Sequence, residues 1–375
     1  MIDADLFSLK LKKNGYEFIS GVPDSLLKEL CKSLDKTFKK HITATNEGSA
    51  VALAIGYYLG KKKPGIVYLQ NSGLGNIINP ITSLASPKVY GIPMLLLIGW
   101  RGEIIKKQIQ DEPQHKMQGL ITIDQLKLLR IPFKIINAKT TNISKIINNL
   151  KKISLKKNTP VALVIRKNTF SKSKFKTKKK KEINFYREDA IKEIILSTTN
   201  KKKIIISTTG MASRELYEVR LKNDDNTFQD FLTVGGMGHA SQIATGLSLT
   251  TKKKIICIDG DGALLMHTGA LGISAKADNL IHIVINNKSH DSVGGQETLG
   301  KNLNFNKIAK NFGYKYCYDV KKQDQISNIL NKTFKQKGSC MIVINCNKGY
   351  RKDLGRPEKN MKLRKNKFIK FVNKI

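Results

Sequence analysis

Short apolar runs recur along the chain and predict buried strands separated by helices. The runs lie at residues 65–69, 93–98 and 161–165 in the first half, and at 203–206, 255–258, 281–285 and 341–344 in the second. Within each run the apolar residues are consecutive and do not alternate with polar ones, which is typical of parallel strands that helices cover on both faces. We therefore predict an α/β protein with two parallel sheets, one in each half of the chain.

A lysine-rich stretch separates the two halves. Residues 171–182, SKSKFKTKKKKE, include seven lysines among 12 positions. Such a block repels itself and buries nothing, so it predicts a linker between a first domain at 1–170 and a second at 183–350. A nuclear-localisation or nucleic-acid patch is the alternative, and it fits poorly with a metabolic α/β chain.

The chain ends in a basic segment, residues 351–375, whose composition differs from that of the second domain. Apolar residues recur there at helical spacing and predict a helix that docks one face on the body of the protein. Contact with a membrane surface is the weaker alternative. The apolar residues are Phe368, Ile369, Phe371, Val372 and Ile375.

The length of the chain and the distribution of its apolar residues allow two domains without a membrane span. At 375 residues, each half is long enough to bury its own core. No stretch of 18 uncharged apolar residues occurs, and the N-terminal MIDADLFSLKLKK lacks an apolar signal region. We expect a soluble, cytoplasmic protein with no membrane partner. The five cysteines are scattered without metal-ligand spacing, which favours reduced core residues.

The formal net charge of +38 would ordinarily indicate a polyanionic partner. However, only nine of the 67 basic residues are arginine, and no zinc-finger, RNP or aromatic-interleaved basic pattern occurs. Abundant lysine on exposed helix faces explains the charge more simply than a nucleic-acid site does. A basic nucleic-acid-binding protein on an enzyme scaffold therefore stays a distant alternative.

The most specific local signal lies where two neighbouring strand runs end. Gly260-Asp261-Gly262 ends one run, and Asn286-Asn287 ends the next. Because parallel strands end at one edge of a sheet, Asp261 and Asn287 can approach the same point. Their oxygens suit Mg²⁺ or Ca²⁺ better than zinc, and they leave coordination positions for phosphate oxygens. The glycines let backbone N–H groups approach such a phosphate closely.

A single acid opens a small-residue helix in the first half. In TNEGSAVALAIGYYLG, residues 45–60, Glu47 falls where a short apolar stretch has ended and a helix begins. Taken alone, this carboxylate could simply complement the partial positive charge of the helix N-terminus.

Together these features resemble the thiamine diphosphate enzymes. The spacing of 26 residues from Asp261 to Asn287 matches the binding motif of that family. The resemblance implies that Asp261, Asn287 and the carbonyl of Ser289 hold Mg²⁺, with Gly260 and Gly262 beside the cofactor. It also implies that Glu47 is catalytic, because the family's glutamate bonds the aminopyrimidine and drives the 4′-amino group into the form that takes the C2 proton.

A third segment, DFLTVGGMGHASQIATGLSL at 230–249, resembles the family's cofactor-bending segment. By that resemblance Met237 props the cofactor in its bent shape, and the Gly235 carbonyl accepts from the 4′-amino group. Ordinary core filling is the alternative for Met237.

Within the family, residues 15–300 are similar to the phosphonopyruvate decarboxylases, which lack a middle domain. The resemblance implies two doubly wound domains of the thiamine diphosphate-binding fold, one for the pyrimidine and one for the diphosphate. One departure is Lys288 in NNKSH, where small residues usually follow. The matching segments are GVPDSLLKELC (21–31), NEGSAVALAIGYYLG (46–60), QNSGLGNIINPITSL (70–84), IGWRGEI (98–104), DEPQH (111–115), TTGMASRELYE (208–218), GGMGHAS (235–241) and NNKSHDSVGGQET (286–298).

The implied reaction converts 3-phosphonopyruvate to phosphonoacetaldehyde and CO₂. Arg101, at the end of a strand run, is the best candidate fork for the phosphonate, since arginine binds tetrahedral oxyanions bidentately. An ordinary surface or core-capping arginine is the alternative. His115 and His290 could manage proton transfer or bond the anionic group, and an ordinary loop role is the alternative for each. Asp24, Ser25 and Asn71 match the family's substrate loops.

In this family the cofactor lies between two subunits, so the resemblance implies a homo-oligomer, a dimer or larger, with the active site at the subunit interface. Sulfopyruvate decarboxylase is the nearest alternative function, because its substrate is nearly isosteric. Acetolactate synthase-like carboligation is disfavoured by the missing middle domain.

Overall fold

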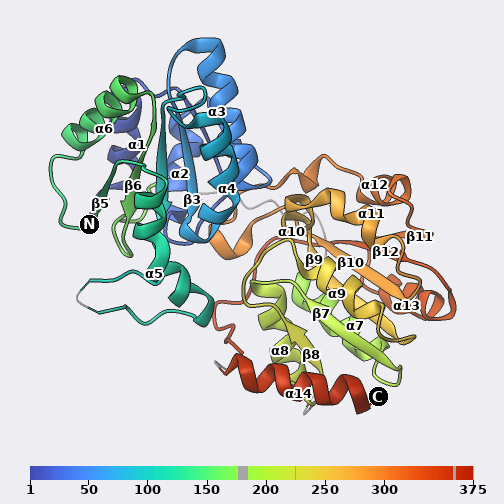
Figure 1. Ribbon diagram of the computed structural model, residues 1–375. Helices are drawn as coiled ribbons and strands as arrows, with labels where there is room; N and C mark the ends of the chain where they lie inside the picture. Colours follow the sequence, from blue (N-terminus) through green and yellow to red (C-terminus); the bar gives the residue numbers. More distant parts are fainter. Residues whose placement is uncertain (106, 176–184, 224, 358–359, 375) are drawn as a thin grey trace. The chain divides into compact units, whose positions relative to one another are not determined.

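The computed structural model describes residues 1–105, 107–175, 185–223, 225–357 and 360–374. The chain divides into two compact units, residues 1–178 and 179–375 (Figure 1). Most of the predicted linker, residues 176–182, lies outside the described residues. Each unit has its own sheet and its own cores.

In the described part of the first unit, six parallel strands form one sheet in the order β2-β1-β3-β4-β6-β5. The strands are β1 (Phe18–Gly21), β2 (Lys40–Thr43), β3 (Gly65–Gln70), β4 (Met94–Gly99), β5 (Phe133–Ile136) and β6 (Pro160–Ile165). The helices are α1 (Ala4–Lys13), α2 (Lys28–Thr37), α3 (Glu47–Lys61), α4 (Leu74–Pro80), α5 (Pro113–Leu128) and α6 (Ile143–Lys157).

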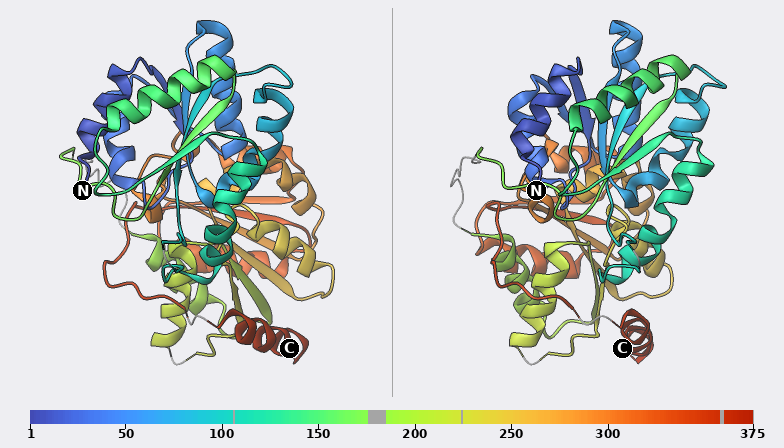
Figure 2. Two further views of the ribbon diagram at one scale, coloured as in Figure 1. Left: turned by 60° about the vertical axis from the view of Figure 1, so that its left-hand side comes forward. Right: turned by 90° about the vertical axis from the view of Figure 1, so that its left-hand side faces the viewer.

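Helices cover both faces of this sheet, as Figure 2 shows. On β4, Leu95 and Leu97 join the core cluster that includes residues of α1, α2 and α6. The alternate residues Leu96 and Ile98 join the cluster that includes residues of α3, α4 and α5. Because successive strand side chains point to opposite faces, burial of both faces requires the unbroken apolar run seen in the sequence.

The second unit has a six-stranded parallel sheet in its described residues, in the order β11-β12-β10-β9-β7-β8. Its strands are β7 (Lys203–Ser207), β8 (Asp230–Leu232), β9 (Lys254–Gly260), β10 (Leu280–Asn286), β11 (Tyr316–Val320) and β12 (Cys340–Asn345). Its helices are α7 (Arg187–Ser197), α8 (Met211–Lys222), α9 (Ala240–Ser248), α10 (Asp261–Met266), α11 (Leu271–Ser274), α12 (Phe305–Asn311), α13 (Gln325–Lys335) and α14 (Met361–Lys374). The predicted α/β class with two parallel sheets is confirmed.

The C-terminal helix α14 packs on the second unit through its apolar residues. Phe368 is buried, with its ring centroid 5.5 Å from that of Phe231, and Val372 packs against the same core cluster. Ile369 is 47% exposed, and Ile375 lies outside the described residues. Within the described ranges, no helix is long and apolar enough to cross a membrane. All five cysteines are free, and four of them are buried.

Candidate active site

Glu47 is the first residue of α3, and its carboxyl group is enclosed. The preceding Asn46 caps the helix by accepting a 2.8 Å hydrogen bond from the Ser49 backbone N–H. Glu47 is 5% exposed, and its Oε2 accepts a 2.7 Å hydrogen bond from Asn76 Nδ2. A Cβ at Gly73 would lie 2.4 Å from Glu47 Oε1, so only glycine fits against this carboxyl group. A purely helix-capping acid would not need such enclosure.

A partly buried charge cluster lies where β1 and β4 end. Arg101 directs Nε and Nη2 to the two oxygens of Asp111, with a distance of 2.8 Å from Nε to Oδ2. Its Nη1 donates to Ser25 Oγ at 2.9 Å. Asp24 is fully buried beside this cluster, and its Oδ2 has no hydrogen-bond partner among the described residues.

The pKa values of Asp24 and Asp111 are shifted in opposite directions because the two side chains have different hydrogen-bond partners. Burial raises the pKa of Asp24 to about 6, against the opposing effect of the Arg101 charge. Burial would also raise the pKa of Asp111, but its hydrogen bonds to Arg101 and to backbone N–H groups hold that pKa well below its usual range. Asp111 is therefore the fixed anionic partner of Arg101, and Asp24 is the acid that can hold a proton near neutral pH.

Asn71 and His115 lie at the same edge of the first sheet. The Asn71 side chain donates to Arg101 O and Thr122 Oγ1, both at 2.9 Å, and accepts from Arg101 N at 3.1 Å. It thereby fixes the backbone of Arg101. His115 is buried in the first turn of α5, with Nδ1 3.4 Å from Gln118 Oε1. Burial and the nearby Arg101 charge lower the pKa of His115, which keeps its imidazole neutral at pH 7.

In the second unit, Asp261 is the first residue of α10 and is 2% exposed. Its Oδ2 accepts a hydrogen bond from Thr298 Oγ1. Burial raises the pKa of Asp261 to about 6, although Thr298 and backbone N–H groups oppose this effect. A buried carboxylate whose pKa is raised by desolvation is stabilised in its charged form by a bound cation.

The loop after β10 packs directly against the start of α10. Residue Ile285 of β10 is in register with Gly260 of β9, so the two strand ends lie side by side. A Cβ at Gly262 would lie 2.7 Å from His290 Cε1, and no larger residue would fit there. Burial lowers the pKa of His290 to about 4. His290 is therefore neutral at pH 7 and lies against the helix that Asp261 begins.

The oxygen groups in the loop after β10 are of the kind that binds a hard divalent cation. The Asn287 side chain is held by hydrogen bonds, with Nδ2 donating to Asp291 and Oδ1 accepting from Ser289 N at 3.2 Å. Ser289 Oγ and Asn286 Oδ1 are buried and have no hydrogen-bond partner in the described part of the chain. A Cβ on residue 300 would lie 2.6 Å from Asp261 Oδ2, so glycine there keeps space open beside that oxygen. Carboxylate and amide oxygens are the ligands that Mg²⁺ and Ca²⁺ prefer.

The segment with Gly235 and Met237 lies between β8 and α9 and packs on α10. Gly238 has φ +90°, and a Cβ there would lie 3.1 Å from the Ala263 carbonyl oxygen. Met237 is half-buried and belongs to none of the core clusters in the described residues.

The predicted residues thus gather at the carboxyl edge of the sheet in their own unit. The structure adds partners that sequence reasoning missed: Asn76 on Glu47, Asp111 on Arg101, Thr298 on Asp261 and Asp291 on Asn287. Asp111, Asp291 and Thr298 occur inside the matching segments DEPQH and NNKSHDSVGGQET. Their presence in these segments could have marked them as candidate site residues. The sequence alone, however, does not show which side chain each of them contacts.

Two known sequence families cover these sites. Residues 3–128 match the thiamine pyrophosphate enzyme, N-terminal TPP binding domain, and residues 208–344 match the thiamine pyrophosphate enzyme, C-terminal TPP binding domain. The phosphonopyruvate decarboxylase of Streptomyces viridochromogenes is 31% identical over 361 residues, covering 92% of this chain and 88% of that protein. The chain belongs to the thiamine diphosphate-dependent decarboxylases. It is accordingly a carboxy-lyase with two thiamine diphosphate-binding domains and no middle domain, as the sequence predicted.

Other relatives of this decarboxylase carry two different names. The phosphonopyruvate decarboxylase of Streptomyces hygroscopicus is 29% identical over 375 residues, covering 96% of this chain and 91% of that protein. The sulfopyruvate decarboxylase of Methanosarcina acetivorans is 28% identical over 312 residues, covering 77% of this chain and 76% of that protein. The first matched region contains Glu47 and Arg101, and the second contains Met237, Asp261 and Asn287.

Proposed function

We propose that this decarboxylase converts 3-phosphonopyruvate to phosphonoacetaldehyde and CO₂, with thiamine diphosphate and Mg²⁺, in cytoplasmic phosphonate biosynthesis of the 2-aminoethylphosphonate type. The observation that carries the substrate is the cluster of the buried Asp24 with the partly buried Ser25 and Arg101. A phosphonate dianion would compete with Asp111 for the arginine fork, and Ser25 would donate to a further phosphonate oxygen. Two relatives that span at least 92% of the chain are named phosphonopyruvate decarboxylases.

Residues of the second unit would hold the cofactor by its charged end. Asp261, Asn287 and the Ser289 carbonyl would ligate the cation that binds the diphosphate, and Gly260 and Gly262 would let backbone N–H groups approach that diphosphate. The Gly235 carbonyl would accept a hydrogen bond from the aminopyrimidine, and Met237 would support the ring system. Thiamine diphosphate, when bound, supplies the nucleophilic carbon and stores the electron pair that CO₂ leaves behind.

Residues of the first unit would control protons and the substrate's charge. Asn76 occupies Glu47 Oε2, which leaves Oε1 to share a proton with the aminopyrimidine. His115 is neutral at pH 7, as is His290 of the second unit, so each can accept a proton on its free ring nitrogen or donate a hydrogen bond from its N–H. Asn71 would keep Arg101 in place through its backbone. The burial of Glu47 and Asp24 excludes water from these groups.

Sulfopyruvate decarboxylation is the second candidate, because a specific observation favours it. The sulfopyruvate decarboxylase subunit alpha of Methanocaldococcus jannaschii is 43% identical over 100 residues, although this match covers only 26% of the chain. Asp24 favours the phosphonate. With a pKa of about 6 it can share a proton with a phosphonate oxygen, and a sulfonate is too weak a base for such sharing.

A comparison of the rates with three separate substrates decides between these two functions. The purified chain with thiamine diphosphate and Mg²⁺ would be supplied separately with phosphonopyruvate, sulfopyruvate and pyruvate, and CO₂ and aldehyde would be measured. We expect the highest kcat/KM for phosphonopyruvate. A preference for sulfopyruvate would replace the substrate assignment while leaving the reaction class intact.

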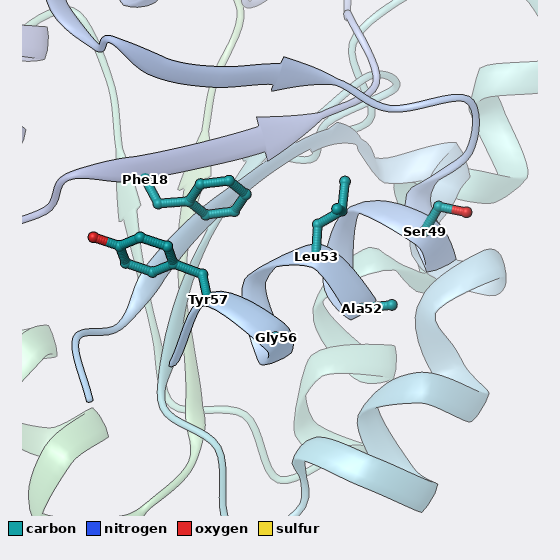
Figure 3. Close-up of a pocket in the computed structure, with 6 residues that line it drawn as sticks. All are labelled: Phe18, Ser49, Ala52, Leu53, Gly56 and Tyr57. Atoms are coloured by element: carbon teal, nitrogen blue, oxygen red, sulfur yellow. The ribbon is translucent and has the colours of Figure 1, made fainter. Parts of the chain in front are cut away.

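We also propose a homo-oligomer, a dimer or larger, with each active site at a subunit interface. Helix α3, which begins with Glu47, has an exposed face of small and apolar residues, including Leu53 at 38% and Leu59 at 67% exposure. A hollow on this face is lined by Phe18, Ser49, Ala52, Leu53, Gly56 and Tyr57 (Figure 3). An apolar helix of another subunit would fit there. Sedimentation of the wild type and of Gly56→Arg tests this proposal, and a monomeric wild type would refute it.

A further inference from the structure

Asp291 accepts hydrogen bonds from three parts of the second unit on a single oxygen. Its Oδ2 accepts from Asn287 Nδ2 at 2.7 Å, from Gly349 N at 2.9 Å and from Arg187 Nη1 at 3.1 Å. The Asp291 side chain is only 6% exposed. A carboxylate in this setting is held in one position, because moving it would leave three largely enclosed donors unpaired.

The position of Asp291 is set by the framework of the unit. Arg187 begins α7 and makes a bidentate pair with Glu215 of α8, at 2.7 Å from Nε to Oε2 and 2.9 Å from Nη2 to Oε1. The Arg187 and Glu215 side chains are 8% and 1% exposed. Helix α7 and the loop after β12 therefore contact Asp291 directly, and α8 contributes by holding Arg187. None of these three elements carries a residue predicted to bind the cofactor.

The fixed carboxylate of Asp291 determines the orientation of the Asn287 side-chain amide. An asparagine side chain has one donor group and one acceptor group, and only the oxygen can ligate a cation. Asp291 can pair only with the donor group, so Asn287 Nδ2 turns toward it and Oδ1 turns away. Oδ1 accepts a 3.2 Å hydrogen bond from Ser289 N, and its second lone pair can serve a metal. Without Asp291, the amide could rotate and present its NH₂ group to the cation.

We propose that Asp291, held by the Arg187–Glu215 pair, is a positioning residue that keeps the amide oxygen of Asn287 directed at the divalent cation. This inference rests on the proposed function, because it assumes that Asn287 is a cation ligand. The cation itself is not bound by Asp291 in this scheme. Partners that orient metal ligands commonly change metal affinity by about 10- to 100-fold when they are removed.

Calorimetry on the full-length apo protein tests the proposal. Mg²⁺ would be titrated in the presence of saturating thiamine diphosphate, for the wild type, Asp291→Ala, Asp291→Asn and Glu215→Gln. We expect the apparent Kd for Mg²⁺ to rise about 10- to 100-fold in Asp291→Ala. Asp291→Asn keeps an acceptor oxygen, and Glu215→Gln acts only through Arg187. The apparent Kd for Mg²⁺ should therefore rise less in these two variants than in Asp291→Ala.

Asp230→Ala is the matched control. Asp230 and Arg220 form a comparable buried bidentate pair in the same unit, at 2.8 and 3.0 Å, with side chains 2% and 3% exposed. We expect this variant to lower the thermal midpoint of the apo protein while its Mg²⁺ Kd stays within about twofold of the wild type. The control separates loss of metal positioning from general loss of stability.

Each result bears on the proposal. An unchanged Mg²⁺ Kd in Asp291→Ala would overturn it, and so would an equal Kd increase in Asp230→Ala. If Asp291→Ala does not fold, an unchanged Kd in Asp291→Asn together with Glu215→Gln overturns it instead. A wild type that binds no thiamine diphosphate with Mg²⁺ would overturn the proposed function and this inference together, and that outcome is recognised before any variant is measured.

Discussion

The two units share one topology and differ in the chemistry at the sheet edge. The first sheet has the order β2-β1-β3-β4-β6-β5, and the second reads β8-β7-β9-β10-β12-β11, the same order with each strand number raised by six. Asn71 and Asp261 follow corresponding strands, as do Arg101 and Asn287. One edge therefore has a guanidinium that suits an anion, and the other has oxygens that suit a cation.

The two buried acids sharpen this comparison. Burial raises the pKa of both Asp24 and Asp261 to about 6. Asp24 lies near the positive charge of Arg101, whereas Asp261 has a neutral hydrogen-bond partner in Thr298. The same backbone topology thus places a carboxyl group in two electrostatic settings. The difference teaches that the loops at the strand ends, rather than the sheet, determine what each edge binds.

The largest effect is expected at the cation edge. Asp261→Ala removes the charged oxygen donor, so Mg²⁺-dependent binding of thiamine diphosphate should be lost, and kcat/KM should fall by roughly 10³-fold or more. Calorimetry and CO₂ release measure the two effects. Cofactor binding within a few-fold of the wild type would contradict the role assigned to Asp261.

The next effect separates cofactor activation from cofactor binding. Glu47→Gln keeps the shape of the side chain but cannot transfer a proton, so kcat should fall by about 10²- to 10⁴-fold. The Kd for thiamine diphosphate should change by only a few-fold, because in the proposed site the second unit would bind the charged end. Steady-state kinetics measures the fall in kcat, and calorimetry on the same variant measures the Kd for thiamine diphosphate. A normal kcat in Glu47→Gln would remove the catalytic role of this residue.

A smaller effect is expected at the anion edge. Arg101→Lys loses the bidentate fork, so KM for phosphonopyruvate should rise by about 10²-fold while cofactor binding is unaffected. Asp111→Asn is the informative companion, because removal of the competing carboxylate should lower KM a few-fold. Initial rates over a range of substrate concentrations measure both. Equal KM values for all three proteins would show that the anion binds elsewhere.

The smallest effect concerns stability and its pH dependence. Asp24 is protonated in both states below its unfolded pKa, so Asp24→Asn should change stability little near pH 3. As pH rises through about 6, the folded state must ionise a buried acid that is already ionised when unfolded, so wild-type stability falls. At pH 8 Asp24→Asn should therefore be more stable by roughly 3 kcal/mol.

Urea unfolding at pH 3 and pH 8 measures this difference. Asp124→Asn is the control, since the Asp124 side chain is 70% exposed. We expect the control to show no comparable pH-dependent gain. A stability gain for Asp24→Asn that is equal at both pH values would argue against burial of a titrating acid.

The sequence predicted the central strands better than the edge strands. The runs at 65–69, 93–98, 255–258 and 281–285 all became strands that are buried on both faces. The edge strands β2, β5 and β11 are partly exposed along their length, so their sequences lack an unbroken apolar run. β8 has only three residues, too few for any periodicity to show.

By itself, the sequence determined the two parallel sheets, the acid at the start of α3 and the pairing of Asp261 with a following Asn-Asn, because strand and helix periodicity and motif spacing are local properties. Only the tertiary structure decided that Asp111 occupies the Arg101 fork and that Asp291 orients Asn287. Asp291 is anchored by Arg187, 104 positions away. Such contacts depend on how helices and loops pack, and packing joins residues whose separation follows no repeating pattern along the chain.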